Sequence, residues 1–491
     1  MALPSIDYAP RDPAADVLHR VVREHLQTFL AEAAHRRDGE AVPRFVEDEF
    51  QAFLACGWLA GGFARFQCVG CQAERLVAFS CKGRGFCPSC GGRRMTERAA
   101  HLLDHVIPDV PVRQWVLTLP HRLRYLLAWR HDLCKAVVRV LLREVHRHLR
   151  TRARERGLSD VRGGAVAVVQ RFGGALNLNV HIHALVLDGV FARGDDGRLR
   201  FHAAPALDAA DVADVLAAIA PGVHRLVRRH GADPEDASAS DAFAEASPLL
   251  AGLAAASVQG GGALGGPLAA RPRRMGPSSV DRGVPALGAG HARWAGFDLH
   301  AAVRVPAGQR DRLERVCRYA LRPPVAGARL QLTPDGQVVL QLRHAWADGT
   351  THIAFTPTAF LARLAVLVPR PHVNLVLYHG VLAPRAAWRG EVVPHVSAHR
   401  ATGVVADPPV ADAASAPPRH PSARGASWAD LMRRAFEVDV LACPRCGGRL
   451  RLIALIEASA VARRILTHLR LPADVPRPAP ARAPPNSDDD A

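Results

Sequence analysis

The sequence contains no apolar run of about 18 residues, the length that a membrane-spanning helix requires. Residues 1–16 carry acidic side chains and lack the apolar core of a signal peptide. We therefore expect a soluble, cytoplasmic protein with no membrane partner. Tyrosine is also scarce, with four residues in a chain of 491. This scarcity restricts any chemistry that depends on a phenol to very few positions.

Lysine is nearly absent, because only Lys82 and Lys135 are lysines among 63 basic residues. The chain is rich in alanine, proline and glycine, so GC-rich codons explain part of the arginine excess. The formal net charge is nevertheless +17, which favours a polyanionic partner, nucleic acid first. Arginines on solvated faces are the alternative explanation of this charge.

The hydrophobic patterns predict a protein that mixes helices and strands. Two alternating stretches, 164–172 and 176–187, are separated by Gly173-Gly174 and predict an antiparallel hairpin. Further strands are expected over 113–120, 298–305 and 373–378, and helices over 17–30, 95–106, 133–154, 309–320 and 358–367.

Two Cys-x-x-Cys knuckles, Cys68 to Cys71 and Cys87 to Cys90, are separated by fifteen residues. Each knuckle turns two thiolates toward one point, and two knuckles supply the four ligands of a tetrahedral structural zinc site. Cys81 lies between them and is an alternative ligand. Cys56 is expected to be a small buried residue.

A third knuckle, Cys443-Pro-Arg-Cys446, stands near the C-terminus. It supplies only two ligands and has no second knuckle nearby. A metal site there would need ligands from elsewhere in the chain or from a second chain.

His181 and His183 flank Ile182 in an apolar strand. Residues i and i+2 of a strand share a face, so both imidazoles can reach one metal ion, whereas on a helix they would diverge. Satisfied structural histidines are the alternative. A second His-x-His, His146-Arg-His148, falls in a predicted helix.

Tyr319 lies in the predicted helix over 309–320, among basic residues. A tyrosine that faces a metal pair can attack a phosphodiester and form a covalent intermediate. A ring that only packs in the helix is the alternative. Tyr378, at the end of a predicted strand, is the rival nucleophile.

Five segments in this order together resemble the rolling-circle insertion-sequence transposases. These belong to the His-hydrophobic-His endonuclease superfamily and carry an N-terminal zinc-binding domain. The resemblance spans residues 45–455 and rests on 66–90, Trp115-Val-Leu-Thr-Leu-Pro120, the His-Ile-His strand, Arg318-Tyr-Ala-Leu-Arg-Pro-Pro324 and Tyr378-His-Gly-Val-Leu-Ala-Pro384.

The resemblance implies an α+β fold, with a central antiparallel sheet, helices on one face of it and a small zinc ribbon before it. It implies that His181 and His183 hold Mg²⁺ or Mn²⁺ and that Tyr319 attacks the scissile phosphate. The products would be a 5′-phosphotyrosine and a free 3′-hydroxyl, and reversal would reseal the strand. The implied partner is DNA, single-stranded at the element ends, and self-association is left open.

One departure concerns the tyrosines. The two-tyrosine branch has a second tyrosine one helical turn away, but here these positions hold Arg315 and Pro323. The chain therefore resembles the single-tyrosine branch of common-region mobile elements. The third ligand of the catalytic metal is unassigned, with Gln170 and His300 as candidates.

We thus expect a metal-dependent tyrosine transposase. A plasmid replication initiator or relaxase, and a non-enzymatic zinc-dependent DNA-binding protein, are the alternatives. The expected units are a helical N-terminal region (1–60), a zinc-binding domain (61–100), a catalytic domain (101–390) with a flexible insertion (234–292), a linker (391–427), a C-terminal region (428–470) and a disordered tail (471–491).

Overall fold

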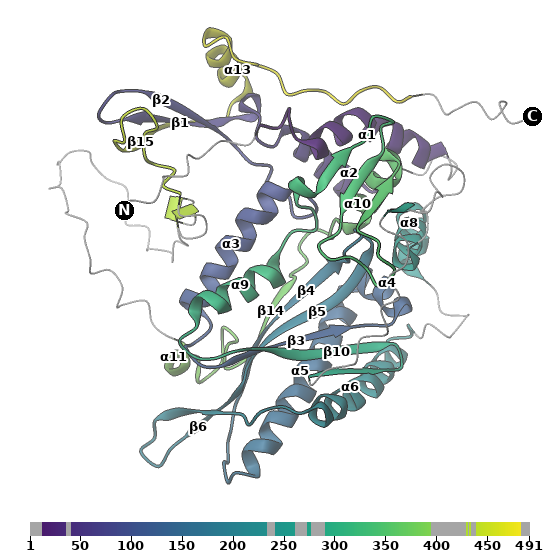
Figure 1. Ribbon diagram of the computed structural model, residues 1–491, viewed down its shortest axis with the longest axis vertical. Helices are drawn as coiled ribbons and strands as arrows, with labels where there is room; N and C mark the ends of the chain where they lie inside the picture. Colours follow the sequence, from purple (N-terminus) through teal and green to yellow (C-terminus); the bar gives the residue numbers. More distant parts are fainter. Residues whose placement is uncertain are drawn as a thin grey trace, which may run out of the picture.

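The computed structural model describes residues 12–35, 41–232, 241–260, 273–275, 290–393, 429–430, 432–433 and 438–482. Its centre is a six-stranded sheet in which every neighbouring pair of strands is antiparallel (Figure 1). The order across this sheet is β14 (Val376–Gly380), β4 (Gly164–Phe172), β5 (Leu178–Leu187), β3 (Val112–Thr118), β10 (Phe297–Val305) and β9 (His291–Trp294).

The two predicted strands around Gly173-Gly174 do form a hairpin, and β5 lies in the interior of the sheet. Side chains alternate along a strand, so β5 serves two cores. Ile182, Ala184 and Val186 belong to one hydrophobic cluster, whereas Leu185 and Leu187 belong to another on the opposite face. This double burial explains why β5 reads as an almost continuous apolar run.

Helices cover both faces of the sheet. One face contacts α4 (His121–Trp129), α6 (Ala209–Arg229), α8 (Pro248–Gln259) and α10 (Pro357–Leu367), and α5 (His131–Arg154) packs against α4 and α6. On the other face α9 (Arg310–Leu321) contacts β4, and α3 (Pro88–His105) packs on α9. The predicted α+β class with antiparallel sheets is confirmed. The expectation of helices on only one face of the sheet is wrong, because the second hydrophobic face of β5 is also covered by helices.

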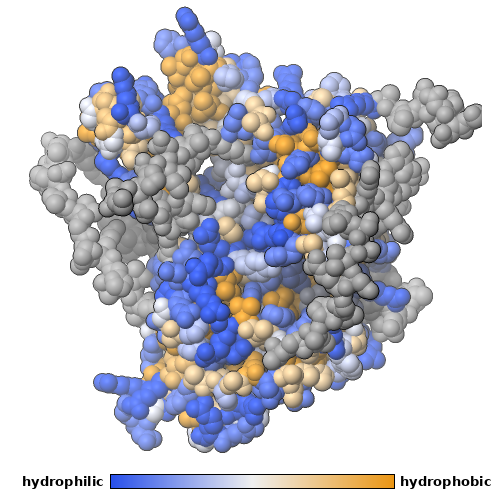
Figure 2. Space-filling view, viewed as in Figure 1, coloured by the Kyte–Doolittle hydropathy of each residue, from blue (hydrophilic) through white to orange (hydrophobic). Residues whose placement is uncertain are grey.

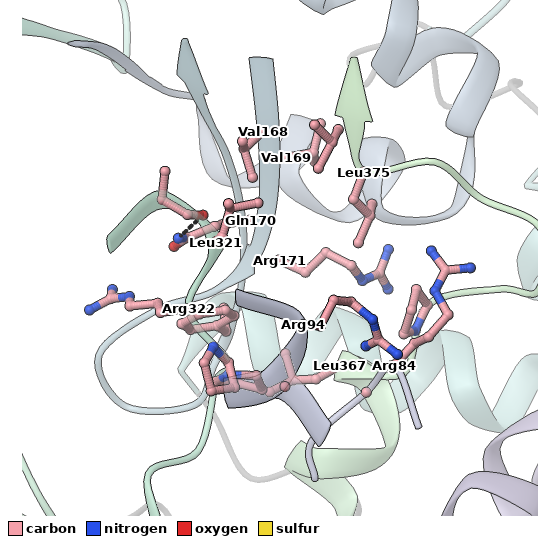
Figure 3. A pocket seen from close by; sticks show the side chains of 18 of the residues that line it. Arg84, Arg94, Val168, Val169, Gln170, Arg171, Leu321, Arg322, Leu367 and Leu375 are labelled. Atoms are coloured by element: carbon pink, nitrogen blue, oxygen red, sulfur yellow. Dashed lines mark hydrogen bonds between the residues drawn. The ribbon is translucent and has the colours of Figure 1, made fainter. Parts of the chain in front are cut away.

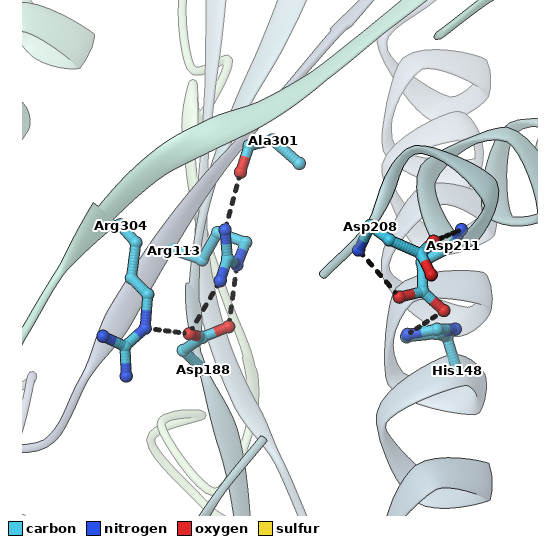
Figure 4. A network of polar contacts seen from close by, with 7 residues as sticks. All are labelled: Arg113, His148, Asp188, Asp208, Asp211, Ala301 and Arg304. Atoms are coloured by element: carbon cyan, nitrogen blue, oxygen red, sulfur yellow. Dashed lines mark hydrogen bonds and ion pairs between the residues drawn. The ribbon is translucent and has the colours of Figure 1, made fainter. Parts of the chain in front are cut away.

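A buried carboxylate ties three strands together at the end of β5 (Figure 4). Asp188 is 2% exposed and accepts hydrogen bonds from Arg113 Nε at 2.8 Å and Arg304 Nε at 2.7 Å. Arg113 also donates to the carbonyl oxygen of Ala301 at 3.0 Å. The two buried ions, Arg113 and Asp188, pair with each other, and the second arginine on the carboxylate, Arg304, is partly exposed. The network therefore links β3, β5 and β10 without leaving a buried ion unsatisfied.

The N-terminal part of the chain forms a smaller body beside the sheet. It comprises α1 (Val17–His35), α2 (Arg44–Ala55), η1 (Leu59–Gly61), β1 (Phe63–Cys68) and β2 (Glu74–Ala78), followed by α3. The C-terminal strand β15 (Leu450–Ile456) pairs antiparallel with the far edge of β1, giving the order β15-β1-β2. The following helix, α13 (Ser459–His468), contacts η1, so this C-terminal segment packs on the N-terminal module (Figure 1).

Part of the expected flexible insertion is packed structure. Within 234–292, residues 241–260 form α7 (Ala242–Ala246) and α8. The Phe243 ring stacks on Trp129 with centroids 4.1 Å apart, and Ser257 Oγ accepts a hydrogen bond from the backbone N–H of Leu178 at 2.9 Å. The sequence of α8 shows no clear helical period, because its own residues, mainly alanine and leucine, make most of its faces apolar and leave no polar stripe.

Other expected segments fall outside the described residues. These include most of the remaining insertion, nearly all of the linker over 391–427 and residues 483–491 of the tail. Residues 471–482 are described, and Ala479 N–H donates to the carbonyl oxygen of Arg23 on α1 at 2.8 Å. Among the described residues, the structure has no helix whose length and hydrophobicity would let it span a bilayer.

The remaining elements form a four-stranded sheet and a ribbon that border the core. The sheet has the order β11-β12-β13-β8, and Gly336 and Gly349, both with positive φ, lie in the turns between its strands. The ribbon consists of β6 (Gly189–Arg193) and β7 (Leu199–Ala203). The other elements not yet named are β8 (Arg273–Met275), η3 (Gly327–Arg329), β11 (Leu330–Leu332), β12 (Val338–Gln341), β13 (His352–Phe355) and α11 (Arg389–Val392).

Candidate active site

The histidine pair lies on the face of β5 that α9 covers. His181 and His183 are 9% and 3% exposed, and their ring centroids are 4.9 Å apart. Period-two alternation puts both rings on one face while Ile182 packs into the opposite core. In contrast, His146 and His148 lie on the helix α5, where residues two apart diverge.

Neighbouring groups orient the ring nitrogens of the pair. His181 Nδ1 is 2.9 Å from the carbonyl oxygen of Asn179, an acceptor, so Nδ1 carries the proton and Nε2 presents its lone pair. His183 Nδ1 is 3.0 Å from the side-chain amide of Gln114 on β3. His183 Nε2 is buried and has no hydrogen-bond partner among the described residues.

The orientation of the Gln114 amide decides what His183 can do. If the NH₂ group faces the ring, His183 Nδ1 accepts and the proton sits on Nε2 as a buried, unsatisfied donor. If the amide is turned, Nδ1–H donates to the oxygen and Nε2 offers a lone pair to the cavity. Only the second arrangement suits a metal ion, and such outer hydrogen bonds are usual for metal-binding histidines. The donor set therefore fits a divalent ion.

Burial favours the neutral form of both rings. It lowers the pKa of His181 to about 4 and that of His183 to about 3. The charges of His181 and Arg322 lower the pKa of His183 further. Both imidazoles are thus neutral near pH 7, so each ring keeps one nitrogen with a free lone pair.

Tyr319, at the C-terminal end of α9, meets the histidine pair. Its ring is 46% exposed, and its centroid is 5.8 Å from that of His183 with the planes at 81°. The Arg322 guanidinium lies 4.5 Å from the centre of the Tyr319 ring. The phenol is therefore accessible beside the two imidazoles and one positive charge.

The rival, Tyr378, is placed elsewhere on the same sheet. It lies on β14 opposite Val166 and packs against the hydrophobic cluster beneath α3 and α9. Burial raises the pKa of Tyr378, so it ionises less readily than a solvent-exposed phenol. The structure brings Tyr319, and not Tyr378, to the histidines.

The histidines and Tyr319 line one open cavity of about 620 Å³. Arg312 and Arg315 of α9 add positive charge to its wall. The remaining lining residues come from β3, β5, β10 and α9: Gln114, Val116, Thr118, Asn179, His300, Val303 and Val316.

The two candidates for a third metal ligand are placed differently. His300 lines the cavity from β10, whereas Gln170 does not. Gln170 Nε2 instead donates to the carbonyl oxygens of Tyr319 at 3.1 Å and Ala320 at 2.6 Å, which holds the end of α9 on β4. The sequence reasoning missed Gln114, although a glutamine inside the apolar strand 112–118 was a visible signal.

Two smaller cavities extend the positive surface on either side of Arg322. One, of about 280 Å³, includes Tyr319, Arg329, Arg343 and Trp346 in its lining. The other, of about 110 Å³, lies between the sheet and the start of α3 (Figure 3). Arginines from the cysteine-rich module, β4 and the segment after α9 line it: Arg84, Arg94, Arg98, Arg171 and Arg322.

Burial lowers the pKa of Arg171 to about 10, and its Nε has no hydrogen-bond partner among the described residues. Burial also lowers the pKa of Arg84 and Arg98, and the charge of Arg94 lowers both further. Arginines that lie this close together repel one another. An anion bound between them would relieve this repulsion, so the cavity favours anions.

The cysteines form two separate groups, which corrects the expected single site of Cys68, Cys71, Cys87 and Cys90. Within each group the four Sγ atoms lie within 4.8 Å of one another. The inner cysteine cluster contains Cys56, Cys81, Cys87 and Cys90, and the outer cysteine cluster contains Cys68, Cys71, Cys443 and Cys446.

The path of the chain explains this division. Cys68 ends β1 and Cys71 lies in the turn before β2, whereas Cys87 and Cys90 lie at the start of α3. Cys56, which follows α2, approaches Cys87 Sγ at 3.7 Å and Cys90 Sγ at 3.9 Å. The expectation that Cys56 is only a small buried residue is therefore wrong, because its sulfur belongs to the inner cysteine cluster. Cys81, the alternative ligand, is also a member of this cluster.

Comparison with protein families gives two matches. Residues 164–389 match the family described as "Putative transposase", and residues 21–119 match the "Transposase zinc-binding domain". No curated protein and no solved structure matches the chain.

Residues 164–389 are thus similar to transposases and residues 21–119 to a transposase zinc-binding domain, and this similarity suggests a DNA-cleaving enzyme. More narrowly, they support a transposase of the IS91 type of insertion sequence. The zinc-binding domain and the cysteine clusters together support structural Zn²⁺.

Proposed function

We propose that this transposase nicks and rejoins single-stranded DNA at the ends of its element through a 5′-phosphotyrosine on Tyr319. The observation that carries the proposal is the meeting of Tyr319, His181 and His183 in one accessible cavity. Three side chains from two elements, separated by more than a hundred residues in sequence, converge there. A ring that only packed in α9 would not need to be almost half exposed beside two neutral histidines.

The histidine pair would hold a divalent ion, Mg²⁺ or Mn²⁺, through the two Nε2 atoms. Such an ion supplies Lewis-acid polarisation of the scissile phosphate. Asn179 and Gln114 fix the ring orientations from outside the site. His300 lines the same cavity but lies two strands from His183, and it does not come within ligand distance of the pair in the structure.

Tyr319 would act as the nucleophile. Its Oη forms a bond to phosphorus, the bond from phosphorus to the 3′ oxygen breaks, and the phenolic proton ends on the released 3′-hydroxyl or in solvent. Attack by a 3′-hydroxyl on the phosphotyrosine reverses the step and joins strands without an external energy source. Gln170 anchors the end of α9, so Tyr319 is held at a fixed height above the sheet.

The DNA strand would follow the arginine-lined surfaces beside Tyr319. Arg322, Arg329 and Arg343 can contact phosphates, and Trp346 in the same cavity wall offers a surface on which a base can stack. The narrower arginine cavity adjoins the zinc module, which would place a neighbouring phosphate against both parts of the protein.

The test is cleavage of single-stranded oligonucleotides from the DNA that flanks the gene. Protein, oligonucleotide and Mg²⁺ or Mn²⁺ are incubated, resolved on denaturing gels, and covalent adducts are mapped by mass spectrometry. We expect a DNA-linked peptide containing Tyr319, lost in Tyr319→Phe and kept in the matched control Tyr378→Phe. An adduct on Tyr378 would overturn the nucleophile assignment, and binding without cleavage of any flanking strand would favour a DNA-binding protein without nuclease activity.

A further inference from the structure

The outer cysteine cluster joins residues that are far apart in the sequence. Cys68 Sγ lies 3.5 Å from Cys446 Sγ, and Cys71 Sγ lies 3.7 Å from Cys443 Sγ. Cys443 and Cys446 lie outside both of the matched family ranges. The zinc-binding domain match therefore does not account for this second group.

The sulfur separations fit a metal ion better than disulfides. A disulfide would bring two Sγ atoms to about 2.05 Å. Four thiolates around Zn²⁺ at about 2.3 Å form a tetrahedron whose edges are about 3.8 Å long. The separations of 3.5 and 3.7 Å are close to that edge.

The backbone around the sulfurs also has the form of two zinc knuckles. The backbone N–H groups of Gly70 and Cys71 point at Cys68 Sγ, and that of Gly448 points at Cys446 Sγ. A Cβ atom at Gly448 would lie only 3.2 Å from Cys68 Sγ. Thiolates favour N–H donors, and a glycine allows the second knuckle to approach the first closely.

We propose that the outer cysteine cluster binds a second Zn²⁺ ion, which fastens the C-terminal segment 438–475 to the N-terminal zinc module. Each part of the chain contributes one knuckle, so neither half of the site has four ligands alone. The protein would then carry two structural zinc ions, and its zinc module would be completed only after the catalytic sheet and the C-terminal segment have been made.

The outer cysteine cluster lies where the C-terminal segment has little apolar support. β15 pairs with β1, and the N–H of Val69 donates to the carbonyl oxygen of Arg449 at 3.0 Å. Beneath the cluster only Cys68, Cys443 and Leu450 are buried, whereas α13 at the other end of the segment buries Ala462 and Leu466 against Ala60 and Phe63. Both apolar cores are small, so metal ligation would add stability that offsets the entropy of ordering the segment.

The two clusters differ in access to solvent. Three of the four inner cysteines are buried, namely Cys56, Cys87 and Cys90. In the outer cluster Cys446 is exposed and Cys71 is partly exposed. A chelator in solution can therefore reach the outer ion first, and we expect the zinc to be released in two phases.

The experiment measures zinc per chain in the purified full-length protein by native mass spectrometry and elemental analysis. We expect two ions in the wild type and one in Cys443→Ser/Cys446→Ser. The control Cys134→Ser/Cys317→Ser changes two buried cysteines that belong to neither cluster and should retain two ions. A single ion in the wild type, or two ions in Cys443→Ser/Cys446→Ser, would overturn the proposal.

A second measurement covers the case in which the double variant fails to fold. Zinc release from the wild type into a colorimetric chelator should show a fast phase and a slow phase of equal size. Hydrogen exchange in β15 should increase during the fast phase, whereas exchange in α3 should not. Release in one phase, or simultaneous exposure of β15 and α3, would contradict a separate outer ion.

Discussion

The hydrogen bond between Gln114 and His183 gives a sharp test of the proposed metal site. Gln114→Met keeps a side chain of similar length at a position that is 5% exposed, so the packing should change little. The change removes the side-chain amide that contacts His183 Nδ1, and hence the group that fixes the tautomer of this ring. Loss of such an outer hydrogen bond weakens metal affinity by roughly 10- to 100-fold, or about 1.4–2.7 kcal/mol.

The assay is titration of the full-length protein with Mn²⁺, followed by electron paramagnetic resonance of the free ion. We expect Gln114→Met to bind Mn²⁺ more weakly by that factor, while its thermal unfolding midpoint stays near the wild-type value. Thr118→Val is the matched control, since Thr118 lines the same cavity but makes no hydrogen bond to either ring that we observe. Unchanged Mn²⁺ affinity in Gln114→Met would refute the role of Gln114, and no Mn²⁺ binding by the wild type would refute the site.

Three further predictions concern stability and DNA binding. Asp188→Ala leaves the buried Arg113 without its carboxylate partner and should lower the free energy of unfolding by about 3–5 kcal/mol in urea titrations; a change below about 1 kcal/mol would contradict the network. Burial lowers the pKa of His146 to about 4, so the unfolded chain binds the extra proton below pH 6.5, and stability should fall by up to roughly 3 kcal/mol from pH 6.5 to 4. His146→Leu should reduce that slope by the share of His146, while His181 and His183, whose pKa values are also lowered, keep theirs; an unchanged slope would exclude His146. Arg329→Ala and Arg343→Ala should each reduce the salt dependence of single-strand binding by about 0.7 per lost phosphate contact, whereas exposed Arg198→Ala should not.

The arginine cavity in Figure 3 lies where the cysteine-rich module meets the six-stranded sheet. Arg84 and Arg94 come from the cysteine-rich module, and Arg171 comes from β4 of the catalytic sheet. Arg84 donates to the carbonyl oxygen of Val373, which ties the module to the segment before β14. An inner zinc ion that orders this module would therefore also position arginines beside the catalytic cavity.

Local patterns in the sequence were sufficient for most elements of the catalytic domain. The alternation over 164–187 predicted β4 and β5, and the spacing of His181 and His183 predicted that they share a face. The helix that carries Tyr319 was also predicted within one residue at each end. These predictions depend on the period with which side chains return to the same face, which is 2 residues in a strand and 3.6 in a helix. The local backbone geometry sets both periods.

Contacts between distant segments could not be obtained in this way. The pairing of β15 with β1 brings Cys443 and Cys446 to Cys68 and Cys71, and it divides the cysteines differently from their spacing in the sequence. A Cys-x-x-Cys knuckle specifies two ligands but not which other knuckle completes the site. That choice depends on the direction in which each turn leaves the sheet.

The same distinction applies to the site as a whole. The residue types alone show which groups could hold a metal and attack a phosphate, since imidazole and phenol chemistry belongs to His181, His183 and Tyr319 in any fold. The packing of distant segments places Tyr319, rather than Tyr378, beside the histidines and Gln114 against one of them. The physical reason is that strand order and helix packing, which depend on burial of both faces of β5, set distances between residues that no local pattern relates.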